Sequence, residues 1–225
     1  MNDNDPLRIY EKALLLTLKD REGAVAISHC GLALAGALLS DLFIEDRLVA
    51  EGKHQLVRVT DGSATGDELL DECLALIGAA PKPKPAQHWI TRLGDQPSLM
   101  HRIAGRLCRR GILREDESKV LFFFTRKLYP ELDPEPEAAL VAELTEAIFT
   151  DTDEVSPHAA ALIALGNSVG LLGATFTRRE LHARKARLEA IARGEVGEAA
   201  KAAAAARSAT IAAAALVAVL PTIIS

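Results

Sequence analysis

Aromatic residues are scarce in this chain of 225 residues, where Phe, Trp and Tyr together make up 4%. A core with so few rings must be built mainly from Leu, Ala, Val and Ile. Because Ala and Leu favour helices while aromatic and β-branched residues favour strands, this composition predicts closely packed helices. Hydrophobic residues at 49% and charged residues at 25% are ordinary for a globular protein and argue against wholesale disorder.

An excess of positive charge is also missing. Twenty-six basic residues stand against 31 acidic ones, which gives a net charge of −5. No global basic field therefore exists to collect nucleic acid or an anionic membrane, and any such binding must rest on a local patch. The few cysteines, Cys30, Cys73 and Cys108, have neither CxxC spacing nor a histidine at zinc-ligand spacing. They are expected to be reduced core thiols of a cytosolic protein.

Signatures of catalysis are absent from the sequence. It contains no GxSxG, no GxxxxGK[ST], no GxGxxG and no HExxH, and its six histidines are dispersed. Asp151, Asp153 and Glu154 are close enough in sequence to suggest a cation site, but an acidic solvated loop explains them better. We therefore expect no enzymatic activity, no cofactor and no metal.

The two ends of the chain differ in character. Residues 1–6 are polar and acidic, so they lack the features of a signal peptide and are expected to be disordered. Residues 208–225 are uncharged and largely apolar, at the lower length limit for a membrane-spanning helix. Because this run is rich in Ala and interrupted by Pro221, we expect a buried core helix, with a tail anchor as the alternative.

The hydrophobic spacing predicts one mostly α-helical domain over residues 1–225. A capping-box pattern, Thr65 with Glu68, predicts the start of one helix. A strand is expected over residues 55–60. A β-hairpin is expected with arms at residues 112–113 and 119–125 around a charged turn at 115–118. Glycines at 111, 166 and 194 are expected to end helices. Residues 11–18 are a short apolar run. Apolar periodicity indicates the remaining helices at residues 28–43, 98–110, 136–149, 157–165, 177–193 and 198–220.

Two basic stretches have two possible explanations each. Arg102, Arg106 and Arg110 repeat every four residues, so their side chains share one helix face. A second group lies within residues 178–187. Either group could complement the C-terminal end of a helix dipole as a solvated face. Either could instead hold a phosphate group, because guanidinium forks match phosphate oxygens.

The expected hairpin contains the apolar run Leu121, Phe122, Phe123 and Phe124. Three consecutive phenylalanines cannot all face one side of a strand, so some apolar surface must project or be covered by a partner. Beside a basic helix end, such a hairpin would suit an anionic membrane surface. The helix, glycine and hairpin also have the order of a winged-helix DNA-binding unit. The acidic balance and the lack of a Ser-, Thr-, Gln- or Asn-rich recognition helix count against nucleic acid as a partner.

Several segments, in order, resemble the Golgi phosphoprotein 3 family, including its bacterial members. The runs that carry the resemblance are ALLLTLKDREG at residues 13–23, LAGALLSDL at 34–42, TGDELLDECL at 65–74, LCRRGIL at 107–113, the segment 119–124 with the following Tyr129-Pro130, and ARKARL at 183–188. The resemblance covers most of the chain, and its first and third runs are quite specific. The Ala-rich composition would suit a bacterial member.

The resemblance implies a helical bundle wrapped by amphipathic helices, with a protruding β-hairpin and with residues 208–225 inside the bundle. It also implies a cytoplasmic, non-enzymatic, peripheral membrane adaptor. In the eukaryotic members this domain binds phosphatidylinositol 4-phosphate and recognises the cytosolic tails of membrane enzymes. Their hairpin serves membrane insertion and homo-oligomer contacts, and it matches Leu121, Phe122 and Phe123 here.

The resemblance does not extend to the phosphate pocket of the eukaryotic members. Ala35 stands at one of its arginine positions, and Pro97 and Met100 stand at two more. We predict that Arg102, Arg106 and Arg110 supply the headgroup contacts instead, on anionic phospholipid. The alternative is a cytoplasmic scaffold that oligomerises through its hairpin without lipid.

Overall fold

The computed structural model describes residues 6–18, 30–120 and 124–196. Over these residues the chain is mostly α-helical, as predicted, with nine α-helices, one 3-10 helix and five short strands. The elements are α1 (Ile9–Leu15), α2 (Cys30–Ile44), β1 (Leu48–Glu51), β2 (Leu56–Val59), α3 (Glu68–Gly78), β3 (Lys84–Pro85), α4 (Ala86–Gly94), α5 (Leu99–Arg109), β4 (Asp116–Val120), β5 (Phe124–Leu128), α6 (Glu135–Phe149), α7 (Pro157–Val169), η1 (Leu171–Ala174), α8 (Arg178–Ala183) and α9 (Lys185–Ala192).

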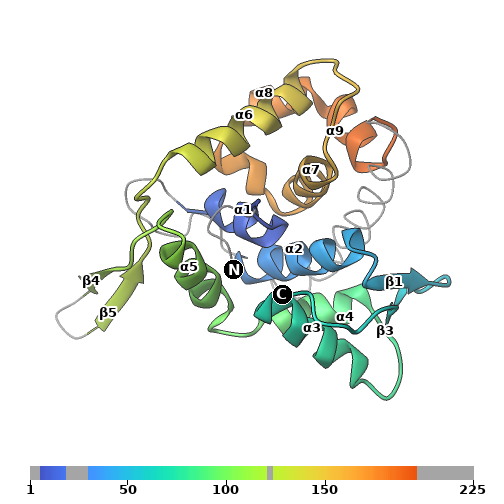
Figure 1. Cartoon of the computed structure of the whole chain (residues 1–225). Coiled ribbons are helices and arrows are strands. Elements are labelled where there is room, and N and C mark those ends of the chain that lie inside the picture. The colour runs from blue at the N-terminus through green and yellow to red at the C-terminus, as the bar shows by residue number, and fades with distance from the viewer. Residues whose placement is uncertain (1–5, 19–29, 121–123, 197–225) are drawn as a thin grey trace.

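Helix α2 is the centre of the fold. Every residue in it except Gly31 and Ile44 is buried, and it contacts α1, α3, α4, α5 and α7 (Figure 1). Its many Ala and Gly residues allow this, because small side chains let neighbouring backbones approach closely. The closest approach is to α4, where a Cβ atom on Gly31 would collide with the carbonyl oxygen of Gly94. The helix predicted at residues 28–43 is confirmed over residues 30–43.

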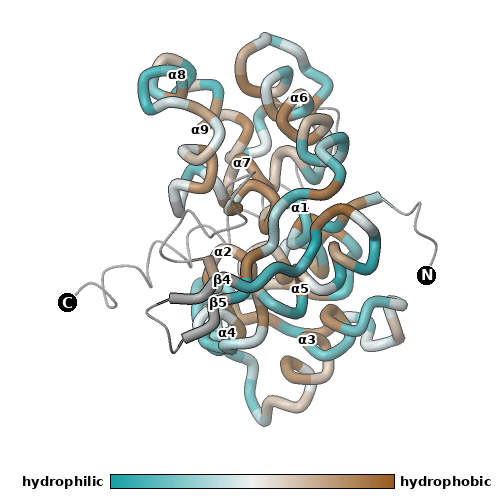
Figure 2. Tube along the Cα trace, turned by 90° about the vertical axis from the view of Figure 1, so that its left-hand side faces the viewer, coloured by the Kyte–Doolittle hydropathy of each residue, from teal (hydrophilic) through white to brown (hydrophobic). Residues whose placement is uncertain are grey.

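The other helices cover α1 and α2 from two sides. Helices α6 to α9 lie on one side, where α7 contacts α2 and α9, while α3 and α4 lie on the other (Figure 1). Hydrophobic positions gather where these layers meet, and α8 at the outside is mainly hydrophilic (Figure 2). The resulting core is one connected cluster that runs from Ile9 to Ile191.

Two small antiparallel sheets complete the fold. Strands β1, β2 and β3 form one sheet in that order, which confirms the strand expected near residues 55–60. Strands β4 and β5 form the second, a hairpin that projects from the helical body beside α5 (Figure 1). A hairpin was predicted here, but its arms were placed wrongly. The charged residues 116–118, expected as a turn, belong to β4 and pair with residues 126–128 of β5.

Three helix boundaries also differ from the prediction. Asp67, not Thr65, caps α3, because the Asp67 carboxylate accepts the N–H groups of Leu69 and Leu70 at 3.0 and 3.3 Å. Helix α7 runs through Gly166 and ends at Gly170, whose φ of 75° favours glycine. The single helix predicted at 177–193 is two helices, α8 and α9, which are separated at Arg184.

Several predictions fall outside the described residues. These are the disorder of residues 1–5, the apolar Leu121, Phe122 and Phe123, and the helix at 198–220 with its apolar run 208–225. Pro6 is described and exposed. Within the described part of the chain, no helix combines the length and the apolar character that a membrane crossing requires.

Candidate functional site

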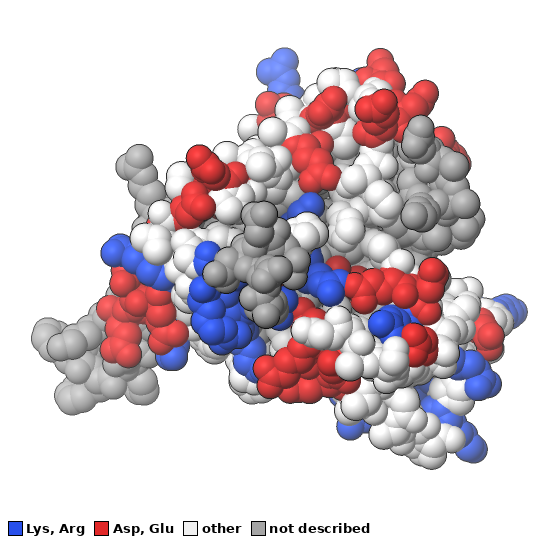
Figure 3. Space-filling model, in the orientation of Figure 1, with Lys and Arg blue, Asp and Glu red and all other residues white. Residues whose placement is uncertain are grey.

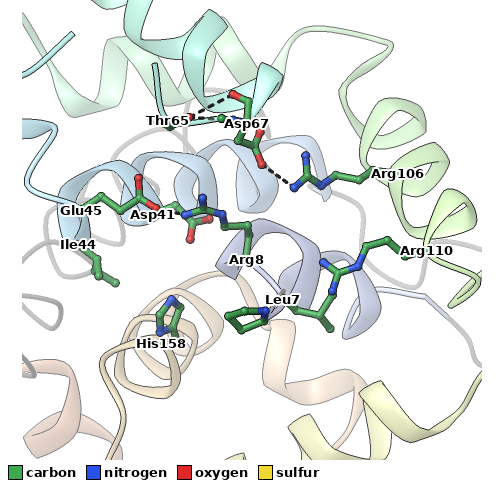
Figure 4. Close-up of a pocket in the computed structure, with 12 residues that line it drawn as sticks. Leu7, Arg8, Asp41, Ile44, Glu45, Thr65, Asp67, Arg106, Arg110 and His158 are labelled. Atoms are coloured by element: carbon green, nitrogen blue, oxygen red, sulfur yellow. Dashed lines mark hydrogen bonds and ion pairs between the residues drawn. The ribbon is translucent and has the colours of Figure 1, made fainter. Parts of the chain in front are cut away.

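Two of the three predicted arginines, Arg106 and Arg110, line a cavity of about 540 Å³, which we call the polar pocket (Figure 4). It lies where the segment before α1, the end of α2, the start of α3, the face of α5 and the start of α7 converge. Its lining mixes acidic and basic side chains. The lining residues are Pro6, Leu7, Arg8, Asp41, Ile44, Glu45, Thr65, Gly66, Asp67, Arg106, Arg110 and His158.

A buried carboxylate, Glu11 of α1, holds α5 against α1 behind this pocket. Its oxygens accept hydrogen bonds from Arg106 Nε at 2.9 Å and from Arg110 Nη1 at 3.1 Å. The Glu11 side chain has no exposed surface, and the two arginine side chains are 11% and 9% exposed. The backbone N–H of Arg8 donates to the same carboxylate at 2.9 Å, so Glu11 also satisfies the first turn of its own helix.

Asp67 joins α3 to α1 and α5. Besides capping α3, its carboxylate accepts the Tyr10 hydroxyl at 2.7 Å and lies 2.9 Å from Arg106 Nη2 (Figure 4). The guanidinium of Arg106 also lies over the ring of Tyr10, 5.9 Å from its centroid, a cation–π geometry. Burial and the Asp67 carboxylate raise the pKa of Tyr10 far above its ordinary value, so the hydroxyl stays protonated as a donor.

Asp41 caps α1 from a different helix. Its two oxygens accept the backbone N–H groups of Ile9 and Tyr10 at 3.0 and 3.1 Å, although Asp41 itself belongs to α2. Burial raises the pKa of this carboxyl to about 7, although the two backbone donors and Arg8 act in the opposite direction. Asp41 therefore changes its charge near neutral pH.

Arg8 and His158 also line the pocket. The Arg8 guanidinium donates to Glu45, and both side chains are about one-quarter exposed. Burial and the nearby Lys12 lower the pKa of His158 below its ordinary value of 6.5, so its ring is neutral at pH 7. The charges that line the pocket are thus arginines and carboxylates.

Arg102, the third predicted arginine, lies outside the pocket. Its guanidinium makes two hydrogen bonds to the carboxylate of Glu72 on α3, at 2.6 and 2.7 Å, and its side chain is 31% exposed. All three predicted arginines therefore have carboxylate partners. On the face that Figure 3 shows, basic side chains gather over α5, and acidic side chains lie beside them over α3 and at the base of the hairpin.

Comparison with known proteins identifies the family. The sequence matches the Golgi phosphoprotein 3 (GPP34) family over residues 9–213, which is most of its length. The chain belongs to the Golgi phosphoprotein 3 family. The resemblance predicted from its motifs is therefore confirmed.

One relative is vacuolar protein sorting-associated protein 74 of Eremothecium gossypii. It is 29% identical to this chain over 155 residues, an alignment that covers 59% of this chain and 46% of the relative. The matched part is thus a little under half of the relative's length.

The second basic stretch of this Golgi phosphoprotein 3 family member has a structural role. Arg184 donates to the carbonyl oxygens of Ile148 and Thr150 at 2.8 and 2.9 Å, and Arg187 donates to that of Ala147 at 3.0 Å. These carbonyls lie at the C-terminal end of α6, where no further turn supplies N–H donors. Both arginines therefore cap α6 and carry the positive charge that this end of a helix favours.

The hairpin residues predicted to insert into a membrane, Leu121, Phe122 and Phe123, lie outside the described residues, between β4 and β5 in the sequence. The base of the hairpin is charged. Lys127 pairs with Glu115 at 2.7 Å, and Arg114 pairs with Asp116 at 3.1 Å.

Other chemistry has little basis in the described residues. Among them, no three His, Cys, Asp or Glu side chains lie close enough together to hold a metal ion. The three cysteine thiols are free, and burial raises the pKa values of Cys30 and Cys73, so both are poor nucleophiles.

Sequence reasoning found the arginines of the site but missed its buried carboxylates, Glu11, Asp41 and Asp67. The sequence around Asp41 did contain one indication of a buried carboxylate. Asp41 follows Leu38, Leu39 and Ser40 in an otherwise apolar helix, and a carboxylate in such a run must be paired when it is buried.

Proposed function

We propose that this chain is a non-enzymatic adaptor that works at the cytoplasmic face of a membrane and binds anionic phospholipid headgroups there. Phosphatidylinositol 4-phosphate is one such headgroup, and the tails of membrane enzymes are candidate protein partners. Family membership and the sorting role in the name of the relative from Eremothecium gossypii support the adaptor function. The net charge of −5 argues against a nucleic-acid partner.

The observation that carries the proposal is the β4–β5 hairpin. It projects from the helical body (Figure 1), and the sequence that joins its strands is Leu121, Phe122 and Phe123. Large apolar side chains on a projecting hairpin gain free energy by entering the interface of a bilayer. Arg102, Arg106 and Arg110 follow one another along α5 and its C-cap, and α5 leads into this hairpin, so we propose these arginines as the basic residues that meet the headgroups.

Vesicle co-sedimentation tests the proposal. We expect anionic vesicles, with or without phosphatidylinositol 4-phosphate, to bind more protein than neutral ones. Arg102→Glu should weaken this binding, because each basic group near an anionic surface contributes about 1 kcal/mol and a reversal changes the charge by two, roughly thirtyfold in affinity. A matched control is Arg58→Glu on β2. Arg58 is also exposed and paired with a carboxylate, but it lies away from the hairpin. Equal effects of the two reversals would refute the assignment of Arg102.

A second candidate function is a scaffold that forms homo-oligomers through the hairpin and does not bind lipid. The observation that favours it is the pairing of Arg102, Arg106 and Arg110 with carboxylates, which an anionic headgroup would have to displace. Phe122→Ser distinguishes the two functions. A variant that becomes monomeric in sedimentation velocity while its vesicle binding is unchanged would support the scaffold.

A further inference from the structure

The polar pocket contains nearly balanced charges. Its three guanidinium groups belong to Arg8, Arg106 and Arg110, while Asp41, Glu45 and Asp67 line it and Glu11 lies directly behind it. With every carboxyl ionised, the side chains carry one negative charge in excess. With one of these carboxyls protonated, the positive and negative side-chain charges are equal in number.

Helix ends shift this balance toward positive charge. Helices α3 and α7 both begin at the pocket, where Asp67 is the N-cap of α3 and His158 lies in the first turn of α7. A helix start carries roughly half a positive charge. When one carboxyl is neutral, the electrostatic potential at the guanidinium groups of the pocket is therefore positive.

We propose that Asp41 is a proton-operated switch of an anion site in the polar pocket. When Asp41 is protonated, the pocket binds a phosphate or sulfate group through Arg8, Arg106 and Arg110. When Asp41 is ionised, its negative charge cancels this positive potential and closes the site. This inference rests on the proposed function, since the phosphate is supplied by a lipid headgroup or by a free anion.

Asp41 differs from the other carboxylates of the pocket in its partners. Glu11 and Asp67 interact directly with guanidinium groups, whereas the hydrogen bonds of Asp41 come from the backbone of α1. Its pKa of about 7, which burial causes, places the change of charge near neutral pH. The charged and titratable groups around it are Arg8, Tyr10 and Glu11 of the α1 segment, Glu45 of α2, Asp67 before α3, Arg106 and Arg110 of α5, and His158 of α7.

Sulfate is the probe of choice, because its charge is constant between pH 6 and pH 8. Isothermal titration of the full chain with sulfate should show affinity about tenfold higher at pH 6, where a carboxyl of pKa near 7 is mostly protonated. Asp41→Asn should reduce this difference to less than twofold. Equal sulfate affinity of the unsubstituted protein at both pH values would overturn the proposal.

Glu45→Gln gives an independent test, because it removes one negative charge from the pocket and leaves in place the hydrogen bonds that Asp41 accepts from α1. Its side chain is partly exposed, so the variant should fold. We expect Glu45→Gln to bind sulfate at pH 8 about as well as the unsubstituted protein does at pH 6. No gain at pH 8 would contradict the charge argument. His158 is another titratable side chain of the pocket, with a pKa lowered by burial, and the pH difference should persist in His158→Gln. Its loss there would assign the switch to His158 and refute the role of Asp41.

A vesicle arm separates this inference from the proposed function. Sulfate binding that depends on Asp41, without any binding to anionic vesicles, would support the switch and contradict the lipid function. Vesicle binding that is the same at pH 6 and pH 8 and in Asp41→Asn, with no sulfate binding, would support the lipid function and refute the switch.

Discussion

Replacing Glu11 by Gln tests whether Arg106 and Arg110 hold the fold together. Glu11 is fully buried and accepts hydrogen bonds from both guanidinium groups. Gln has nearly the same shape, but its NH₂ group would face one guanidinium as a second donor. Two buried cations would then share fewer acceptors. Removing one partner of a buried ion pair costs about 3–5 kcal/mol. Because Arg106 keeps its contact with Asp67, we expect about 3 kcal/mol.

Urea unfolding measures this cost. Trp89, the only tryptophan of the chain, is 1% exposed, so its fluorescence reports the loss of the core. The matched control is Glu72→Gln, which breaks the pair with Arg102 where the Glu72 side chain is 52% exposed. Exposed ion pairs contribute about 0–1 kcal/mol, so this control should unfold almost as the unsubstituted protein does. Equal losses in the two variants would refute the structural role of Glu11 and would make Arg106 and Arg110 available to an external anion.

Three further predictions concern stability. The pKa of Asp41 is higher in the fold than its ordinary value of 3.8, so the contribution of Asp41 to stability is lost as the pH rises. The unfolding free energy should therefore fall by about 3 kcal/mol between pH 5 and pH 8. In urea titrations at these two pH values, Asp41→Asn should remove the fall. In thermal unfolding, Gly31→Ala should destabilise by about 1–3 kcal/mol because its methyl collides with the backbone of α4. Gly105→Ala, in open space on α5, should stabilise by about 0.5–1 kcal/mol. Arg184→Ala should lower the unfolding free energy by about 1–3 kcal/mol, because it removes the donors to the last carbonyl groups of α6. Arg179→Ala should change the unfolding free energy by no more than about 0.5 kcal/mol, and equal losses in the two variants would contradict the capping role of Arg184.

The helices could be predicted because the spacing of Leu and Ala is a local property of the chain. Their caps could be predicted less well. Thr65 and Asp67 are both good N-cap residues two positions apart, and only the tertiary partners of Asp67, Tyr10 and Arg106, decide between them.

The hairpin shows a similar limit. Residues 115–118 have the composition of a turn, but residues 116–118 form part of β4, where opposite charges across the two strands stabilise the pairing. Glu117 pairs in register with Lys127, an arrangement that depends on residues ten positions apart. The site could be predicted least, because Glu11 and its partner Arg106 are 95 residues apart.

The buried carboxylates explain how a core of Leu and Ala acquires one arrangement. Apolar side chains of similar size can pack in several rotations about a helix axis. In this fold, however, Asp41 of α2 must meet the first N–H groups of α1, and Glu11 of α1 must meet two guanidinium groups of α5. Each contact exists at only one rotation of each helix, so the polar contacts select the packing. An anion that enters the pocket competes with the same carboxylates for the arginines and the helix starts. Anion binding and the stability of α1 are thereby coupled, and sulfate should raise the unfolding free energy at pH 6 more than at pH 8.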